Sequence, residues 1–416
     1  MWSWRHRKSV LIIWSILMYK INIQTLAQDC FQNMAAWIPL AEACRLLGVQ
    51  PQTVYAYVSR GRLEVMPDQA DTRRSLYRAE DVAGLAKRKQ DGRKRSTVAA
   101  NTMFGSEPSI PTALCAFFRG RPYYRGQDAV QLARAATLEE VAQLLWDAEQ
   151  PVGFAGLEPP RSHPAGRTTA FLAIAGLAAM GHSTQGRLTR VLHDEAQILV
   201  GTLATGFGAR KANKQPLHLR FAQGWQQPAE IGELLRTAMV LLADHELTSS
   251  AFAARIAAST GASLPACLLA GLTTMSGPLH GDASGRVQAL FDEVQRLGED
   301  KVVDHYLSNA LPLAGFGHHL YPDGDPRAAA LLASFDPPEV IARFFEKVTR
   351  LTGLQPNIDA ALAALVAHCR LPLDAAFGLF ATARSVGLLA HSIEQLKVTQ
   401  VIRPRGRYIG RLPNVA

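Results

Sequence analysis

The stretch "SAFAARIAASTGASLPACLLAGLTTMSGPLHG", residues 250–281, decides the fold class. Its Ala, Leu and Ile residues recur at helical spacing, which is the primary sequence signal for helix. The stretch ends in "GPLHG", where Gly277, Pro278 and Gly281 would hold His280 at an exposed turn of the backbone. The sequence therefore predicts helix followed by a loop that presents a titratable side chain.

The same Ala-rich periodicity recurs through most of the chain after residue 110. One such stretch opens with Thr137 and has Glu140 three residues later, which is the pattern of a capping box at a helix start. The sequence after residue 110 has no run of alternating residues typical of strands. We therefore predict a mainly α domain over residues 111–416. Other helical stretches are residues 167–182, 233–246, 342–353, 358–370 and 375–396.

Charge separates the N-terminal quarter from the rest. The chain has 416 residues and a net charge of +9, but its first 100 residues hold 16 Lys and Arg against 8 Asp and Glu, and the remainder hold 28 against 27. A polyanionic partner is therefore to be sought at the N-terminal quarter. The five cysteines are scattered without metal-ligand spacing, and no segment has the roughly 18 apolar residues of a membrane span. We expect a cytoplasmic protein with no membrane partner.

Residues 1–33 combine a short basic segment with a short apolar one. This pattern is typical of an export signal, but the residues that follow have the character of an intracellular protein. Met34 directly precedes "AAWIPLAEACRLLGV" and would make a natural start. We therefore interpret residues 1–33 as a leader that arises from translated upstream sequence, with an export signal or another apolar anchor as the alternatives.

Residues 34–90 have the pattern of a small separate domain, and residues 91–110 that of a charged and polar linker. Two short helices, a hairpin with a basic tip and a further helix resemble the winged helix-turn-helix domains of the MerR and excisionase families. The resemblance implies DNA recognition by the second helix and the wing. A docking or dimerisation module of the same shape is the alternative. The candidate DNA-binding residues are Gln52, Thr53 and Arg60 on the helix and Arg73 and Arg74 in the wing.

Islands rich in polar residues, Gly and Pro interrupt the helical stretches. Taken alone, their residues have ordinary structural explanations: Asp359 can cap a helix, Arg384 can pair with a helix end in the core, and Arg403 can lie in a solvated basic tail. The occurrence of several such islands in one chain indicates an active site. They are "ADHELTSS" (243–250), "SGPLHGDAS" (276–284), "GFGHHLYPDGDPR" (315–327), "QPNIDAAL" (355–362), "ATARSVG" (381–387) and "RPRGRYIG" (403–410).

In this order the islands resemble the citrate synthase family, including the 2-methylcitrate synthases, from residue 123 to residue 408. The resemblance implies a mainly helical domain with a large and a small subdomain, the small one spanning about residues 283–372. It implies condensation of acetyl-CoA or propionyl-CoA with oxaloacetate, which gives citrate or 2-methylcitrate and CoA. Both molecules are substrates, and no cofactor or metal is implied.

Such a condensation removes a weakly acidic α-proton from an acyl thioester, so it needs a base at the α-carbon and a hydrogen-bond donor at the enolate oxygen. The resemblance assigns Asp359 as the base, His280 to the thioester oxygen and His318 to the ketone of the oxo acid. The carboxylates of oxaloacetate suit guanidinium groups. The resemblance also implies that Arg403 reaches the site of a neighbouring subunit, and hence that the protein is a homodimer. The substrate-binding residues are then His245, Arg327, Arg384 and Arg403.

Three places depart from the usual family pattern. His280 is followed by Gly-Asp-Ala-Ser instead of Gly-Gly-Ala-Asn, Thr248 replaces an Asn, and residues 321–324 lack the Lys or Arg that meets CoA phosphates. These departures leave the acyl-CoA preference open. They also support an alternative, a DNA-binding regulator that uses a citrate synthase-like body to sense an acyl-CoA or a carboxylate. A third interpretation is an enzyme whose activity depends on what the N-terminal domain binds.

Overall fold

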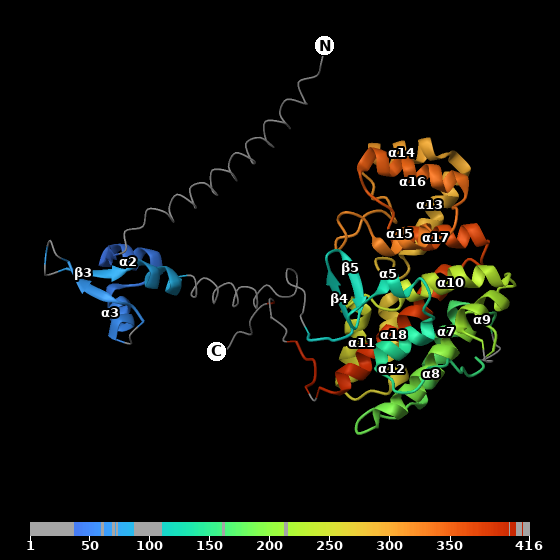
Figure 1. The fold of residues 1–416 in the computed structure, drawn as a ribbon, viewed down its shortest axis with the longest axis horizontal. Coiled ribbons are helices and arrows are strands. Elements are labelled where there is room, and N and C mark those ends of the chain that lie inside the picture. Colours follow the sequence, from blue (N-terminus) through green and yellow to red (C-terminus); the bar gives the residue numbers. More distant parts are fainter. Residues whose placement is uncertain are drawn as a thin grey trace, which may run out of the picture. The chain divides into compact units, whose positions relative to one another are not determined.

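The computed structural model describes residues 37–59, 62–68, 71, 74–86, 110–159, 163–211, 215–398, 400–404 and 410. The chain divides into two compact units, of which the larger spans Ile110–Gly406 (Figure 1). The expected leader (1–33) and nearly all of the expected linker (91–110) lie outside the described residues. The candidate DNA-binding residues Arg60 and Arg73 lie outside them as well.

The N-terminal unit combines two short helices with a small sheet. Helices α2 (Leu40–Leu47) and α3 (Pro51–Ser59) are joined at Gly48, whose φ of 56° ends α2 in a left-handed cap. The strands are β1 (Trp37–Pro39), β2 (Val65–Pro67) and β3 (Ser75–Arg78), antiparallel in the order β1-β3-β2, and residues 79–86 are again helical. Val54 and Tyr77 lie in the shared core. The helices and hairpin expected here are present, and β1 is an additional strand.

The larger unit is mainly helical, which confirms the predicted fold class. Its helices up to the region of His280 are α5 (Ala129–Leu132), α6 (Leu138–Trp146), α7 (Arg167–Met180), α8 (Thr189–Gly206), α9 (Leu217–Gly224), α10 (Ala229–Leu242), α11 (Ser249–Ser259) and α12 (Leu264–Met275). They are followed by α13 (Ala283–Leu297), α14 (Glu299–Ser308), α15 (Pro326–Leu332), α16 (Glu339–Thr352), α17 (Ile358–Cys369) and α18 (Ala375–Leu396). One continuous hydrophobic core connects these helices.

The capping box predicted at Thr137 is present at the start of α6. The Thr137 hydroxyl accepts a hydrogen bond from the backbone N–H of Glu140 at 3.2 Å, and the Glu140 carboxylate accepts one from the backbone N–H of Thr137 at 2.7 Å. The stretch at 250–277 likewise forms helix, in α11 and α12. Local periodicity and end signals therefore predicted these elements correctly.

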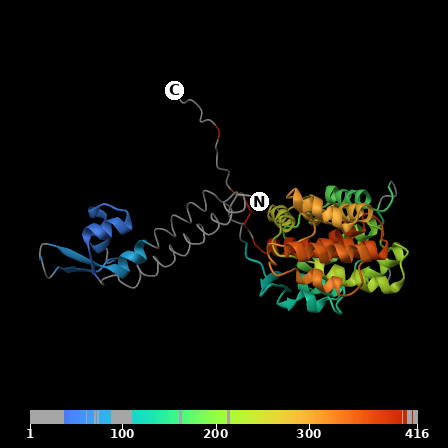
Figure 2. The ribbon, with the colours of Figure 1, turned by 90° about the horizontal axis from the view of Figure 1, so that it is seen from above.

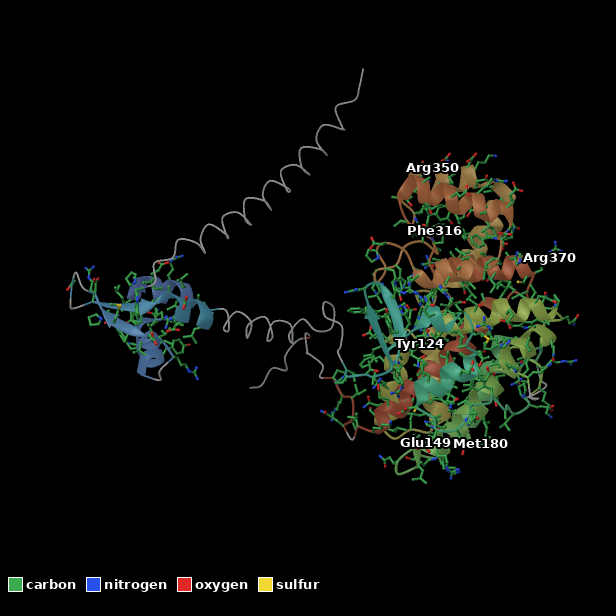
Figure 3. The ribbon with its side chains drawn as sticks, in the orientation of Figure 1. Tyr124, Glu149, Met180, Phe316, Arg350 and Arg370 are labelled. Carbon is green, nitrogen blue, oxygen red and sulfur yellow. The ribbon has the colours of Figure 1, made fainter. Side chains whose placement is uncertain are left out.

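Three short strands at the start of the larger unit contradict the expectation of no strands after residue 110. They are β4 (Cys115–Phe118), β5 (Arg121–Tyr124) and β6 (Gln127–Asp128), antiparallel in the order β4-β5-β6. Strands of two to four residues are too short to produce a visible alternation. The buried Tyr124 connects this sheet to the end of α10, because its hydroxyl donates to the carbonyls of Val240 at 3.1 Å and Asp244 at 3.2 Å (Figure 3).

Helix α18 forms the centre of the larger unit. It packs on α6, α8, α10, α11 and α12, and Figure 2 shows it in red between other helices. It has 22 residues, and the mean hydropathy of its most apolar window is 1.2. Within the part of the chain that the structure describes, α18 is therefore long and apolar enough to cross a membrane, contrary to the sequence-based expectation. Its most apolar window is entirely buried inside the unit, as in the core helix of a globular protein.

Helix α18 comes close to the residues that follow α10 at Gly387. Its backbone N–H donates to the carbonyl of Ala243 at 3.1 Å, and an added Cβ would lie 2.4 Å from Oδ1 of Asp244 and 2.5 Å from the Ala243 oxygen. The substitution Gly387→Ala is therefore expected to lower the free energy of unfolding by about 2 kcal/mol, because α18 must move away from its neighbour. Urea denaturation followed by tryptophan fluorescence measures the effect.

Gly176 on α7 provides a matched control, since an added Cβ there has no atom within 4 Å. Gly176→Ala is expected to leave stability unchanged or to raise it by up to about 1 kcal/mol through helix propensity. Equal stability of the Gly387→Ala variant and the wild type would contradict this account of the contact.

Helices α13 to α17 pack on one another, and Figure 1 shows them grouped at one end of the larger unit. They also contact α10 and α18, and the whole of Ile110–Gly406 forms one compact unit. The proposed boundary of a small subdomain at about residues 283–372 therefore stays a prediction.

Candidate active site

Two loops that are far apart in the sequence are held side by side by backbone hydrogen bonds. The N–H of Gly317 donates to the carbonyl of Gln355 at 2.8 Å, and the N–H of Asn357 donates to the carbonyl of Gly315 at 2.8 Å. Phe316, between the two glycines, packs against Phe344 and Phe345 of α16 (Figure 3). The "GFGH" stretch is thereby attached to the start of α17.

The glycine and asparagine of these loops are needed for this pairing. Gly315 has a φ of 87°, and an added Cβ there would lie 2.8 Å from Cγ2 of Val287. Asn357 caps α17, because its side-chain oxygen accepts the backbone N–H of Asp359 at 3.0 Å. Asp359 therefore lies in the first turn of α17, close to the loop that continues into His318.

His318 lies in a cluster of rings. Its ring centre is 5.3 Å from that of His245 and 4.8 Å from that of Tyr321, and it stacks on His319 at 4.8 Å. The backbone N–H of Leu320 donates to Nδ1 of His318 at 3.2 Å, so a neutral ring carries its proton on Nε2. Burial lowers the pKa of His318 to about 4. At pH 7 the ring is therefore neutral and offers an N–H at Nε2.

His245 lies three positions after Leu242, the last residue of α10, and is 7% exposed. Its Nε2 lies 3.0 Å from the hydroxyl of Tyr321, and its ring packs edge-on against Phe117 at 4.9 Å. Burial, together with the positive charges of Arg327 and Arg384, holds the pKa of His245 well below 6.5. This ring is also neutral at pH 7.

His280 lies in the turn between α12 and α13, where its backbone N–H donates to the carbonyl of Gly277 at 3.0 Å. Its Nε2 lies 2.8 Å from the hydroxyl of Ser250, which lies 3.1 Å from the hydroxyl of Thr248. Burial, and to a lesser degree the charge of Arg384, lowers the pKa of His280 to about 4. The ring is neutral at pH 7, and a chain of two hydroxyls holds one of its nitrogens.

Asp359 has a carboxylate without a hydrogen-bond donor in the part of the chain that the structure describes. Burial raises its pKa to about 6, against the charges of Arg327 and Arg384, which lower it. A carboxylate with such a pKa is mostly ionised at pH 7 and still basic enough to accept a proton from carbon. These properties are those of a general base.

For the condensation that the resemblance implies, the raised pKa of Asp359 predicts a pH dependence of the rate. Only the ionised carboxylate can take a proton, so kcat/KM is expected to rise with pH, with a single-proton midpoint near 6. Initial rates between pH 5 and pH 8, at low concentrations of the acyl thioester, measure the profile. A midpoint near 4, the range of an ordinary aspartate, would contradict the assignment of this group as the base.

Arg327 is almost completely buried and already holds a carboxylate. Its Nε donates to Oδ1 of Asp325 at 3.0 Å and its Nη2 to Oδ2 at 2.8 Å. Although burial opposes the charge on Asp325, Arg327 and its hydrogen bonds hold the pKa of Asp325 below its ordinary value. Asp325 also accepts the backbone N–H of Ile358 at 3.1 Å and so connects α15 to α17. Because Nε and Nη2 already bind Asp325, Arg327 offers Nη1 to a ligand.

Arg384 on α18 is the other buried guanidinium among the candidate residues. Its Nε donates to the carbonyl of Leu242 at 2.9 Å, and it lies over the ring of Phe380 at 4.9 Å. Its terminal nitrogens have no hydrogen-bond partner among the described residues. Burial lowers the pKa of Arg384, partly offset by Asp244. Because its charge also acts on His245, His280 and Asp359, these groups share one electrostatic environment.

Arg403 is not brought together with the other candidate residues. It is exposed, and the preceding Ile402 donates its backbone N–H to the hydroxyl of Ser259 at 3.1 Å, at the C-terminal end of α11. Ser250, which contacts His280, lies at the other end of α11, about 13 Å away at 1.5 Å per helical residue. Within one chain, the segment that carries Arg403 is therefore attached at the opposite end of α11 from the residue that contacts His280.

The candidate DNA-binding residues that are described lie on the N-terminal unit. Gln52 is exposed and Thr53 is partly buried on α3. Arg74 forms an ion pair with Asp71 at 3.3 Å, and Arg78 pairs with Glu64 at 3.1 Å and with Glu80 at 3.4 Å. Acidic neighbours therefore reduce the positive charge expected along the wing.

The departures from the family pattern have local structural partners. Asp282 accepts hydrogen bonds from Nη2 of Arg167 at 2.6 Å and from Nη1 at 3.3 Å, which connects the start of α7 to the start of α13. The guanidinium of Arg167 also lies over Phe377 at 3.9 Å. Thr248 caps α11 through the backbone N–H of Ala251. The charge of Asp282 is thus compensated within the chain.

Sequence reasoning did not identify three side chains that organise this region. Asp325 could have been found, because "DPR" has the pattern of a capping aspartate followed by proline at the first helical position. Ser250 and Tyr321 contact histidines that are 30 and 76 residues away, and no local pattern predicts such pairs.

Comparisons of the sequence and of the fold with known proteins both find citrate synthases. Residues 160–405 match the family model described as citrate synthase, C-terminal domain. The chain is 28% identical over 341 residues to a citrate synthase of Haloferax volcanii, covering 70% of this chain and 90% of that protein. It is 33% identical over 197 residues to citrate synthase 2 of Bacillus subtilis, covering 44% of this chain and 52% of that protein. The chain spans about half the length of most of the curated relatives compared, between 47% and 56% of each.

The fold is similar to solved citrate synthase structures. One is the ternary complex of the Thermoplasma acidophilum enzyme with carboxymethyl coenzyme A and oxaloacetate, which is 24% identical with a TM-score of 0.65. That likeness covers 76% of this chain and 97% of the other. The structure from Thermotoga maritima gives a TM-score of 0.62 at the same identity.

Proposed function

The chain belongs to the citrate synthase family, and from this premise we propose that it condenses acetyl-CoA or propionyl-CoA with oxaloacetate, releasing citrate or 2-methylcitrate and CoA. One observation carries the proposal. A carboxylate with a raised pKa, Asp359, and two neutral imidazoles, His280 and His318, lie within reach of the charges of Arg327 and Arg384. A carbon acid and its ketone acceptor require this set of groups.

In the first step the carboxylate of Asp359 takes a proton from the α-carbon of the acyl thioester. The electron pair of the broken C–H bond forms the enolate, whose oxygen accepts a hydrogen bond from the neutral ring of His280. When the hydroxyls of Thr248 and Ser250 donate along their chain to Nε2 of His280, its Nδ1 carries the proton for this bond. Neutrality matters here, because an imidazolium would hand its proton to the enolate and stop the condensation.

In the second step the enolate carbon attacks the ketone carbon of oxaloacetate. The Nε2–H of His318, fixed by the Leu320 bond to Nδ1, donates to the ketone oxygen and stabilises the negative charge that develops there. That oxygen takes a proton from solvent and becomes the hydroxyl of a tertiary alcohol, and Asp359 returns its proton to solvent. Attack of water on the thioester carbon then breaks the C–S bond and releases CoA.

The dicarboxylate is held by cationic and neutral donors. The terminal nitrogens of Arg384, which have no partner among the described residues, the Nη1 of Arg327 and an N–H of His245 suit carboxylate oxygens. We assign Arg403 to the site of the neighbouring subunit, because it is exposed and its segment is attached at the end of α11 that lies away from the contact with His280. The protein is then a homodimer with shared sites.

Mixed chains test this sharing of sites. His280→Ala and Arg403→Ala chains should each be nearly inactive alone, whereas a mixture refolded together should regain activity, because a hybrid dimer contains one intact site. Sedimentation velocity of the wild type should give a dimer. A monomer, or a mixture as inactive as its components, would contradict the shared site.

The proposed reaction is tested by thiol release from several acyl-CoAs, with and without oxaloacetate, using the purified full chain. CoA release that requires oxaloacetate is expected for acetyl-CoA or propionyl-CoA, and the better substrate gives the acyl preference. Thiol release that is absent, or that does not depend on oxaloacetate, would overturn the proposal.

A second function, DNA binding by the N-terminal unit, is favoured by one observation. Two short helices joined at Gly48 pack on an antiparallel hairpin, which supports a winged helix-turn-helix, and Gln52 is exposed on the second helix. We propose that α3 contacts DNA bases and Arg74 the phosphates. A gel-shift titration at several salt concentrations tests it, since phosphate contacts make affinity fall steeply with salt. Binding that is absent at low salt would favour a docking or dimerisation module instead.

We also propose a cytoplasmic location. Cys44, Cys115, Cys267 and Cys369 are free thiols, as expected of a protein in a reducing compartment. Cell fractionation with an antibody against the larger unit would test the location.

A further inference from the structure

Tyr321 occupies the middle of the ring cluster, yet none of the chemistry above uses it. It is 2% exposed, and its ring lies 4.8 Å from that of His318. The guanidinium of Arg327 lies 5.3 Å from the centre of the same ring, and Phe117 packs edge-on at 5.8 Å. Its hydroxyl lies 3.0 Å from Nε2 of His245. Tyr321 therefore contacts three residues assigned to the oxo acid.

The direction of the hydrogen bond between Tyr321 and His245 follows from the acceptors available. Among the described residues, the Tyr321 hydroxyl has Nε2 of His245 as its hydrogen-bond partner and has no second acceptor. If Nε2–H donated to the hydroxyl, the hydroxyl proton would be buried without an acceptor, which is costly. The hydroxyl therefore donates to Nε2.

This direction determines which nitrogen of His245 carries the proton. A neutral imidazole that accepts at Nε2 has its N–H at Nδ1. Nδ1 of His245 has no hydrogen-bond partner in the described part of the chain, so it is available to a ligand. His318, whose Nδ1 accepts from Leu320, has the opposite tautomer and offers Nε2–H. The two neighbouring rings, 5.3 Å apart, thus present different nitrogens.

We propose that Tyr321 is a positioning residue that fixes His245 in the Nδ1–H tautomer, so that this N–H binds a carboxylate of the oxo acid. The assignment of a substrate carboxylate to this N–H rests on the proposed condensation, whereas the assignment of the tautomer does not. Arg327 and Arg384 supply the positive charge around His245, and the neutral ring adds a hydrogen bond of fixed direction. Tyr321 acts through His245 and touches no reacting atom.

Tyr321→Phe keeps the ring and removes only the hydroxyl. We expect the KM for oxaloacetate to rise about tenfold, as for loss of one buried hydrogen bond, with the KM for the acyl-CoA and kcat changed less than about threefold. Tyr306→Phe is the matched control, because the Tyr306 hydroxyl bonds Glu293 at 3.3 Å on helices α13 and α14 and makes no contact with the ring cluster. Its kinetic constants should equal those of the wild type.

Nitrogen-15 NMR of histidine-labelled protein reports the tautomer directly, without substrate. His245 should give the Nδ1–H pattern in the wild type and should lose it, or become a mixture, in Tyr321→Phe. An Nε2–H pattern in the wild type, or an identical pattern in both proteins, would overturn the proposal even if the enzyme is active. If the wild type shows the expected tautomer but no oxaloacetate-dependent thiol release, the proposed function fails and the positioning role of Tyr321 stands.

Two substitutions of His245 give an independent check. Asn has an amide N–H at the position of Nδ1, and Gln has one near the position of Nε2. His245→Asn should therefore retain more affinity for oxaloacetate than His245→Gln. The reverse order would contradict the Nδ1–H assignment.

Discussion

Asp359→Asn is expected to lower kcat about 10³-fold, within the range for loss of a general base. The amide is nearly the same size as the carboxylate but cannot accept a proton from carbon. Because the Asp359 carboxylate has no hydrogen-bond donor among the described residues and its pKa is raised by burial, removing its charge should not destabilise the fold. Saturation kinetics with the acyl-CoA, and circular dichroism to verify folding, measure the effect.

The control for this variant is Asp336→Asn, an exposed aspartate in the loop between α15 and α16. It should keep wild-type kinetics. Exchange of the α-protons of the acyl-CoA with deuterium from solvent adds a second readout, and it should disappear in Asp359→Asn together with turnover. A folded Asp359→Asn variant with wild-type kcat would remove Asp359 from the mechanism.

His280→Ala is expected to lower kcat by about 10²- to 10³-fold, the usual result of removing one donor to a developing oxyanion. The neutral ring stabilises the enolate oxygen, so its loss should affect the α-proton exchange as strongly as the overall reaction. The affinity for oxaloacetate should change little, because His280 is assigned to the thioester and not to the oxo acid.

His305→Ala serves as the control for His280→Ala. His305 is exposed on α14, where its ring contacts Asn309. Its removal should leave kcat unchanged. If His280→Ala raised only the KM for the acyl-CoA and kept kcat, His280 would be a binding residue, and the enolate would need another donor.

Much of the fold was predictable because its signals are local. The period of Ala and Leu predicted α11, α12 and α18, and the Thr137–Glu140 pair marked the start of α6. The strands β4 to β6 escaped prediction because they are only two to four residues long. They matter for the site, since Phe117 on β4 packs against His245.

The residue types of the candidate site were predictable from the islands, but their partners were not. The resemblance assigned Arg327 to a carboxylate of the substrate, whereas two of its nitrogens are bound by Asp325, two residues before it. The His245–Tyr321 bond depends on the packing of the α10 end against the loop before α15. Such contacts arise from tertiary structure, which also sets the pKa of a partly buried group such as Asp359.

The central claim is that this chain forms a carbon–carbon bond between the α-carbon of an acyl-CoA and the ketone carbon of oxaloacetate. Mass spectrometry of the products from carbon-13-labelled acetyl-CoA or propionyl-CoA with unlabelled oxaloacetate tests it most directly. The account predicts one labelled tricarboxylate for each CoA released, and none with Asp359→Asn. CoA release accompanied by free labelled acetate or propionate, or no labelled tricarboxylate from the wild type, would contradict it.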